Sequence, residues 1–491
     1  MTSQIGITAL NGLVVVGGIF ILNGIIARTY GLSVLGEYLL LRRIAFAMIP
    51  LSVLGITIAI PRYMGISRGE EAKQKQIFSS GLALFLRYGV MVVLLLTIIM
   101  GLKPTVIIAN ASFIDTVLPI STLCLGIAIH QMTYSYYRGS LIMSIANVLH
   151  LVNVGAIPIL LVVFFPYFPI GKIVLYHGLA AMVISLIFLV HPAISGWMYS
   201  RTHREERVQV RTELMSYGIR RILANLGMLC LLSFGPIIIA HWATYEDLAF
   251  FSLGIQVNTM FYPILGPIGI ILLPVFAYHI SSGTADRLSD NLRMLFMAGT
   301  AVGIYATFHL WYFAEPLLFY WLGETTEQGI LLFRLFCLSI TAYLWFELAR
   351  NPIDAYTKVG HNSRNVIVSV LTIAAMIILG VRVLHYPAAI TITFSYVLGF
   401  LILGGLSIRT CYQLYRVINV NIRPFIEVIV LNTLIISGIW LVSIVLDRND
   451  PTAVRILITE LFAFTLYAMG LWWFKQEWLR YFIRRLRQSS A

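Results

Sequence analysis

The sequence predicts an all-α polytopic membrane protein of about 14 transmembrane helices, with two six-helix lobes related by a parallel internal repeat and two extra C-terminal helices. The first observation behind this fold class is composition: 59% of the 491 residues are hydrophobic and 11% are charged, whereas soluble domains have roughly 45–50% and 25%. The second is a series of apolar runs of ~20 residues, the length that crosses a bilayer. The third is a similarity between the two halves of the chain.

Fourteen runs are long and apolar enough to be predicted as spans, and mostly short loops separate them. The most charged internal segment, 197–217, is predicted to be a cytoplasmic linker. It divides an N-terminal lobe at 1–196 from a C-terminal lobe at 218–414, and 415–491 holds the two extra helices and a basic cytoplasmic tail. The predicted spans are 5–27, 38–60, 77–100, 116–136, 141–164, 173–196, 218–240, 248–275, 291–313, 328–349, 365–381, 387–408, 424–446 and 452–474.

Basic residues are distributed unevenly among the loops. Loops after even-numbered spans, together with the C-terminal tail, contain 21 of the 34 Lys and Arg residues, whereas loops after odd-numbered spans contain five. Because positive charge stays on the cytoplasmic side of short loops, both termini are predicted to be cytoplasmic. The net charge of +13 is therefore mostly a topology signal and does not point to nucleic acid.

The stretch 33–65 resembles the stretch 247–279, and the matched prolines of the two stretches lie 213 positions apart. The offset covers six predicted helices, and because six is even, both copies enter the membrane from the same side. This parallel kind of repeat has its axis along the membrane normal, and two such lobes predict a transporter that works by alternating access. The matches that carry the repeat are Pro50 with Pro263, Pro61 with Pro274 and, at an offset of 212, Arg138 with Arg350.

The repeated prolines are predicted to shape the second helix of each lobe. Pro50 and Pro263 fall in mid-span, where a proline kinks a helix, and each is either a transport hinge or a fixed bend. Pro61 and Pro274 are predicted to help end their helices at the cytoplasmic face, because proline cannot donate the backbone hydrogen bond of a helix interior.

Arginines inside or at the ends of the spans are the candidate substrate-binding residues. An arginine at the bilayer centre costs ~2.5–3.5 kcal/mol on the insertion scale, so it needs water or a partner. Arg87 lies close to the mid-plane of its span, where it is predicted to face a wet cavity or a structural partner. The others lie nearer the interfaces and can also snorkel. The candidate cationic residues are Arg42, Arg43, Arg87, Arg220, Arg221 and Arg334.

A polar stripe is predicted on the fifth span, where Asn147, His150 and Asn153 recur every three residues. These side chains suit either the lining of a cavity or hydrogen bonds between helices. Acids are scarce at deep positions, and Glu347 is predicted to pair with Arg350 one turn later. A cavity with more cations than acids suits an anionic ligand such as a phosphate or pyrophosphate, which arginine binds through paired donors.

Several short motifs, in order along the chain, resemble those of one family. They are Gly36-Glu37-Tyr38, Ile60-Pro61-Arg62-Tyr63, Tyr217-Gly218-Ile219-Arg220-Arg221, Leu272-Leu273-Pro274-Val275-Phe276 and Tyr320-Trp321-Leu322-Gly323. To about residue 415 the chain thus resembles the polysaccharide-biosynthesis, or O-antigen (lipid-linked oligosaccharide), flippases of the multidrug/oligosaccharidyl-lipid/polysaccharide flippase superfamily. Arg221 matches the family's arginine in the third motif, whereas Arg220 stands where the family has a proline.

The resemblance implies two six-helix bundles in a V plus two helices, in a bacterial cytoplasmic (inner) membrane. It implies a transporter, not an enzyme, that moves an undecaprenyl-pyrophosphate-linked oligosaccharide, such as an O-antigen unit of lipopolysaccharide, from the cytoplasmic to the periplasmic leaflet. Arg42 or Arg43 would then meet the pyrophosphate or an acidic sugar. The expected partners of this monomer are membrane lipids, a polysaccharide polymerase and assembly proteins, with no nucleic acid, cofactor or metal.

Two other functions stay open from the residues. A multidrug or cation antiporter of the same superfamily would more naturally place carboxylates deep in the first lobe. A membrane-embedded polysaccharide polymerase would need a sizeable water-exposed loop, and no outward loop exceeds about 15 residues. Accumulation of complete lipid-linked units, together with loss of surface polysaccharide, would distinguish the flippase from the antiporter.

Overall fold

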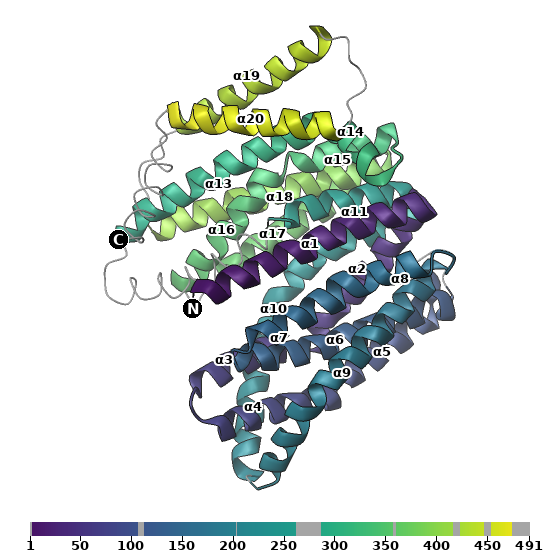
Figure 1. The fold of residues 1–491 in the computed structure, drawn as a ribbon, viewed down its shortest axis with the longest axis vertical. Coiled ribbons are helices and arrows are strands. Elements are labelled where there is room, and N and C mark those ends of the chain that lie inside the picture. Colours follow the sequence, from purple (N-terminus) through teal and green to yellow (C-terminus); the bar gives the residue numbers. More distant parts are fainter. Residues whose placement is uncertain are drawn as a thin grey trace. The chain divides into compact units, whose positions relative to one another are not determined.

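The computed structural model describes residues 2–106, 112–202, 204–261, 286–356, 360–415, 423–445 and 453–473. Within those ranges every regular element is a helix, which confirms the all-α prediction (Figure 1). The chain divides into two compact units, residues 1–249 and 250–491, and each unit is described by itself. The predicted linker 197–217 is helical on both sides of residue 203, and our lobe boundaries stay a prediction.

Unit 1 is built from long helices interrupted by short turns of other helical types. Its α-helices are α1 (Thr2–Tyr30), α2 (Leu32–Ser52), α3 (Ile56–Ile66), α4 (Glu71–Leu84), α5 (Val90–Leu102), α6 (Leu118–Gly139), α7 (Met143–His150), α8 (Ile157–Phe164), α9 (Ile170–Thr202) and α10 (Arg204–Trp242), and α11 (Tyr245–Thr259) continues into unit 2. The π-helical turns are η1 (Phe85–Gly89), η3 (Phe113–Val117) and η4 (Leu151–Ala156), and η2 (Pro104–Val106) is a 3-10 turn.

Helix α6 lies at the centre of unit 1, packed along α9 and against α2 and α3. Glycines allow this close approach: a Cβ at Gly126 would meet the carbonyl of Gly178, and one at Gly178 would meet the backbone of Leu123. In lipid there is little hydrophobic driving force between helices, so close packing of small residues supplies much of their association. Helix α6 is therefore held firmly, and it can carry a site with fixed geometry.

The helices match the predicted spans in order along the chain. Ten segments of the described residues are long and apolar enough to cross a membrane, or eleven if α2 and α3 form one bent span. Shorter apolar stretches lie at Gly227–Trp242 in α10 and Ile426–Val442 in α19 (Arg423–Val445). The predicted span 248–275 lies partly outside the described residues. The chain is thus a multi-pass membrane protein with a helix count consistent with about 14 spans.

The second predicted span is broken in the middle. Helices α2 and α3 meet at an angle of 49°, and two of the three residues between them, Leu54 and Gly55, have φ angles of 50° and 67°. Pro50 lies one turn before the break, where its ring removes the N–H that would bond the carbonyl of Phe46. The structure therefore has the expected kink near Pro50, and its use as a hinge stays a prediction.

Pro61 does not end its helix. It lies inside α3, which continues to Ile66, so our prediction for Pro61 is wrong. The missing N–H removes a single hydrogen bond, to the carbonyl of Thr57, and the rest of α3 still forms. Pro263 and Pro274, the matching prolines of the repeat, lie outside the described residues, so the hinge at Pro263 also stays a prediction.

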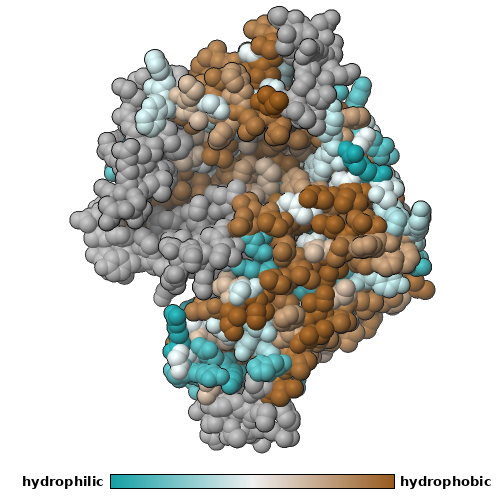
Figure 2. Space-filling model, in the orientation of Figure 1, coloured by the Kyte–Doolittle hydropathy of each residue, from teal (hydrophilic) through white to brown (hydrophobic). Residues whose placement is uncertain are grey.

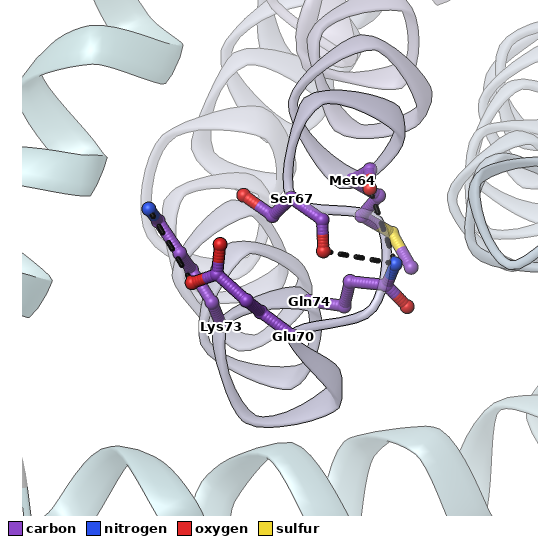
Figure 3. Close-up of polar contacts among 5 residues, drawn as sticks. All are labelled: Met64, Ser67, Glu70, Lys73 and Gln74. Carbon is purple, nitrogen blue, oxygen red and sulfur yellow. Dashed lines mark hydrogen bonds and ion pairs between the residues drawn. The ribbon is translucent and has the colours of Figure 1, made fainter.

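A polar turn joins α3 to α4 on the side that is predicted to be cytoplasmic. Nε2 of Gln74 donates to the carbonyls of Met64 (3.2 Å) and Ser67 (3.3 Å), and Lys73 pairs with Glu70 at 3.8 Å (Figure 3). The last carbonyls of a helix lack donors within the helix. The Gln74 amide supplies such a donor, so it caps α3 and holds the two helices together.

The face of unit 1 that Figure 2 shows is largely apolar beyond this turn. Figure 2 shows hydrophilic atoms gathered at the α3–α4 turn and apolar atoms over the neighbouring α5 and α9. Leu94 and Ile98 on α5, Leu160 on α8 and Ile187 on α9 are all exposed. Contiguous exposed apolar surface of this kind is expected where lipid, rather than water, covers the protein.

Unit 2 contains a second helical bundle and the last two helices of the chain. Its elements are α13 (Asp286–Tyr312), α14 (Ala314–Leu322), α15 (Glu327–Cys337), α16 (Ile340–Tyr356), α17 (His361–Ile377), the π-helical turn η5 (Ile378–Val383), α18 (Ala388–Leu414), α19 and α20 (Ala453–Trp473). Helix α18 packs against α16 and α17, and α13 packs against α16 and α19. Ala301, Val428, Ala463 and Tyr467 form an apolar cluster that joins α13, α19 and α20.

Candidate functional site

Unit 1 contains a cavity of about 290 Å³ beside the break between α2 and α3. Pockets for small ligands have volumes of roughly 300–1,000 Å³, so the cavity can hold one sugar ring or one phosphate group. Its lining combines apolar walls with a small set of polar side chains. The lining residues are Phe46, Pro50, Val53, Gly55, Thr57, Ile58, Ile127, His130, Gln131, Tyr134, Arg138, His150 and Val154.

Helix α6 supplies most of the polar lining because of its periodicity. His130, Gln131, Tyr134 and Arg138 follow one another at steps of one, three and four residues, which places them along one side of the helix. The facing wall comes from the break in the second span, where Thr57 stands in the first turn of α3. The α2 break and the α6 stripe therefore enclose the cavity together.

A chain of hydrogen bonds connects the cavity to the interior of unit 1. The Asn153 amide donates to Nδ1 of His130 (3.0 Å), and Nε2 of His130 lies 3.4 Å from Nδ1 of His150. An imidazole that accepts at one nitrogen as a neutral ring carries its proton on the other. With the Asn153 amide as donor, His130 is a neutral ring that carries its proton on Nε2 and donates to Nδ1 of His150.

Asn153 is the centre of this network. Its side chain is fully buried, and its amide also donates to Oγ of Ser185 (3.1 Å). Its backbone carbonyl accepts from Nε2 of His177 (2.7 Å). Ser185 and His177 belong to α9, so the network ties η4 to both α6 and α9. Buried polar groups need such partners, and here they hold the His130 ring in one orientation.

Aromatic rings lie beside the two cavity histidines. The Tyr134 ring centroid is 5.8 Å from that of His130 and 5.5 Å from that of His150. The guanidinium carbon of Arg138 lies 5.4 Å from the Tyr134 centroid, in cation–π contact. The Arg42 guanidinium lies 5.2 Å from the centroid of Phe46, another lining residue. Rings of this kind offer flat surfaces on which a sugar can stack.

The chemistry of the lining is that of a receptor for hydroxyls or an anion. Arg138 is the charged residue among the described lining residues, and none of those residues carries a carboxylate. Its guanidinium presents paired N–H donors that match phosphate oxygens. Among the described residues, no group of three or more His, Cys, Asp and Glu side chains could hold a metal ion.

The predicted arginines of the second span are half-buried. The Arg42 guanidinium contacts the ring of Phe46, which lines the cavity. Arg43 is the next residue of α2. Arg220 and Arg221 belong to α10, but their side chains lie outside the described residues. The roles of all four as substrate-binding residues stay predictions.

Arg87 and Arg334 stand apart from the cavity. Arg87 is exposed on the π-helical turn η1, with its guanidinium 5.3 Å from the Tyr88 ring centroid. No carboxylate lies within ion-pair distance of Arg87 in the part of the chain that the structure describes. Arg334 belongs to unit 2, where its Nε donates to the carbonyl of Trp311 (3.2 Å). The roles of Arg87 and Arg334 as substrate-binding residues stay predictions.

The polar stripe on the fifth span separates into three different environments. His150 lines the cavity, and Asn153 supports His130 from behind. The Asn147 amide donates to Oγ1 of Thr8 on α1 (3.3 Å), which joins two helices. The structure thus shows both uses that the sequence left open, cavity lining and bonds between helices, within one stripe.

Sequence reasoning missed four polar residues of the lining. His130, Gln131, Tyr134 and Arg138 all lie on α6. The charge count of the loops includes Arg138 among the cytoplasmic charges, because it stands at the end of its span. One sequence signal could have singled out Arg138: the internal repeat aligns it with Arg350. Few positions in a repeat of membrane helices have a charged residue in both copies, so such a pair indicates a candidate functional residue.

Several solved structures share the fold of this chain. The lipid II flippase MurJ, in an inward closed conformation, aligns with a TM-score of 0.62 at 12% identity, over 97% of this chain and 99% of that chain. A mutant of the Vibrio cholerae MATE transporter VcmN aligns with a TM-score of 0.53 at 15% identity, over 85% and 97%. The eukaryotic MATE transporter AtDTX14 aligns with a TM-score of 0.56 at 13% identity, over 84% and 98%.

No protein-family model and no curated protein matches the sequence. At identities of 12–15% the structural likeness shows the fold alone. The chain therefore has the fold that MurJ and the MATE transporters share. The predicted fold class is confirmed.

Proposed function

We propose that this protein is a flippase that moves an undecaprenyl-pyrophosphate-linked oligosaccharide from the cytoplasmic to the periplasmic leaflet by alternating access. The observation that carries the proposal is the cavity of unit 1, whose described lining has an arginine, two histidines and aromatic rings but no carboxylate. Such a lining favours sugar hydroxyls and phosphate oxygens over a cationic drug. The fold shared with a lipid II flippase supports the same class.

Arg87 adds a second contact point to the proposal. An exposed arginine at mid-depth in a span is costly against lipid, so it faces water or an anion. Gly89, on the same turn, packs against the carbonyl of Ser52 at the end of α2. The turn that carries Arg87 thus lies beside the break in the second span, where a change of the bend would move it. Arg42 and Arg43, on the same bent helix, are proposed to meet the pyrophosphate or an acidic sugar.

The proposal includes the surroundings of the protein. It places the chain as a monomer in a bacterial inner membrane with both termini in the cytoplasm, following the distribution of basic residues. The donor that it serves would be completed by sugar transferases inside the cell and used by a polysaccharide polymerase outside, because a flipped unit must be made on one side and consumed on the other.

A cation antiporter is the second candidate function. The two MATE transporters share the fold, and the carboxyl of Glu347 is buried on α16 of unit 2. Buried acids inside membrane helices often mark ion pathways. No ion pair joins Glu347 to Arg350 in the described part of the chain.

The deciding experiment uses cells that lack the protein and tests matched arginine variants in them. Accumulation of complete polyprenyl-linked units on the cytoplasmic face, with loss of surface polysaccharide, is the expected result. Arg138→Gln should restore export poorly, whereas Arg62→Gln should restore it fully. Arg62 is the matched control because it is exposed, lies 4.5 Å from the Tyr217 ring centroid and does not line the cavity.

A charge-assisted hydrogen bond contributes ~1.5–3 kcal/mol, so Arg138→Gln should weaken donor binding about 10- to 150-fold. Arg138→Lys keeps the positive charge but lacks the paired donors, so its donor affinity should lie between that of the wild type and that of Arg138→Gln. Export that is as efficient with Arg138→Gln as with the control would remove the cavity from the proposal. Unchanged lipid intermediates with new sensitivity to cationic drugs would favour the antiporter instead.

A further inference from the structure

A polar cluster in unit 2 is not explained by binding of a lipid-linked sugar. Nδ1 of His309 on α13 lies 2.9 Å from Oε1 of Glu460 on α20, and the Tyr305 hydroxyl donates to Oε2 of Glu460 (3.1 Å). His309 is 4% exposed and its ring stacks on Tyr305 with centroids 4.0 Å apart. Charged and titratable groups inside membrane helices are costly, and they usually have a function.

The geometry leaves one proton position unfilled. Glu460 accepts two hydrogen bonds, which is the pattern of an ionised carboxylate. The His309 ring donates through Nδ1, and its Nε2 has no hydrogen-bond partner in the described part of the chain. With Nε2 unprotonated the cluster carries one net negative charge, and a further proton makes it neutral. His309 also lies in the last turn of α13, where the helix dipole favours a positive charge.

The cluster of His309, Glu460 and Tyr305 is formed by α13 and α20, and in the described residues the other helices that pack on α13 add no side chain to it. Arg334 on α15 bonds the Trp311 carbonyl, and Cys337 on α15 accepts from Thr307 at its own carbonyl. Tyr467 on α20 donates to the carbonyl of Ala301 (2.8 Å). In the described residues, α14, α16 and α19 place no side chain in hydrogen-bond contact with the histidine or the carboxylate.

The predicted topology places the cluster near the outer face of the membrane. Span 291–313 runs outward and ends just after His309, whereas span 452–474 starts outside and reaches Glu460 after about two turns. Glu460 remains partly exposed, at 29% of its side chain, so protons can reach it. We propose that His309, Glu460 and Tyr305 form a proton-binding site through which protonation at the outer face controls the docking of α20 on α13.

The direction of the effect follows from the charges. When the proton is bound, the cluster is neutral and its burial between the helices costs little. When the proton leaves, a net negative charge remains in an apolar contact, and water is needed to solvate it. Docking of α20 should therefore be tight at low pH and loosen as the pH rises. The proposed flippase cycle does not itself require this proton-binding site, so the site would be an additional point at which protons act on the protein.

The test measures docking in the full chain, reconstituted in lipid, with spin labels at Val302→Cys on α13 and Phe462→Cys on α20. Both positions are exposed, and Cys230, the half-buried native cysteine, is replaced by Ser. Between pH 5.5 and 8.5 the distance distribution of the otherwise wild-type protein should lengthen or broaden. Glu460→Gln and His309→Gln should abolish that pH dependence.

The matched control is Tyr467→Phe, which removes the bond to Ala301 and so weakens the same helix contact without removing a group that titrates in this range. It should loosen docking at every pH and keep the pH dependence. A distance distribution independent of pH in the wild type, or the same dependence in Glu460→Gln, would overturn the proposal.

Nitrogen-15 spectra of histidine-labelled protein provide a measurement that does not depend on the spin labels. The signal that disappears in His309→Gln should shift between pH 5 and 9 in the wild type and change its titration in Tyr305→Phe. A constant His309 signal would also overturn the proposal. Neither measurement needs a sugar substrate, so either result stands apart from the test of flippase activity.

Discussion

Replacing Asn153 by leucine should destabilise unit 1 by a predictable amount. The change keeps a side chain of similar size in a fully buried position, but it removes the bonds to His130 (3.0 Å) and Ser185 (3.1 Å). Side-chain hydrogen bonds between membrane helices average about 0.6 kcal/mol, with a maximum of about 1.7. The loss of two should therefore lower the free energy of unfolding by about 1–3 kcal/mol.

A thiol-reactive dye can follow this change, because Cys124 on the neighbouring α6 is buried and reacts only after unfolding. For 150–250-residue domains each kcal/mol shifts the midpoint by about 2–4 °C, so Asn153→Leu should melt roughly 2–12 °C below the wild type. Ser185→Ala removes one of the same two bonds and should cost less.

The double variant of Asn153 and Ser185 provides the control for this reasoning. Both single changes break the same bond, so the double variant should cost less than the sum of the two. Full additivity would show that the two side chains do not interact, and an unchanged melting point of Asn153→Leu would show that the network contributes nothing to stability.

Two further predictions concern glycines at helix contacts, with Gly65→Ala as their control because a Cβ there meets nothing within 4 Å. Gly55→Ala combines a left-handed φ with a Cβ 2.6 Å from the Gly218 carbonyl oxygen, so it should lower the free energy of unfolding by about 2–4 kcal/mol in the dye-melting assay. Wild-type stability of this variant would show that the contact with Gly218 does not hold the α2–α3 break. Gly126→Val should push α6 from Gly178 on α9 and cost about 1–3 kcal/mol, and a neutral effect would show that the crossing can widen freely.

The sequence by itself determined the class of the fold and the order of its spans. Both depend on local properties, namely the length of an apolar run and the side on which basic loops remain, and these need no knowledge of distant contacts. It also located the polar stripe at His150 and Asn153 and the kink near Pro50. Local sequence patterns could not show that the α2–α3 break and helix α6 enclose a cavity together.

Only the tertiary structure decided what these residues do. A constant 100° per residue places the stripe on one helix face, but the π-helical turn η4 changes the winding between His150 and Asn153. One therefore lines the cavity while the other supports His130 across the interface with α6. The contact of His309 with Glu460 joins residues that are 151 positions apart in the chain. Local pattern contains no information about which distant helix a polar side chain will meet, because that choice is made when the whole bundle packs.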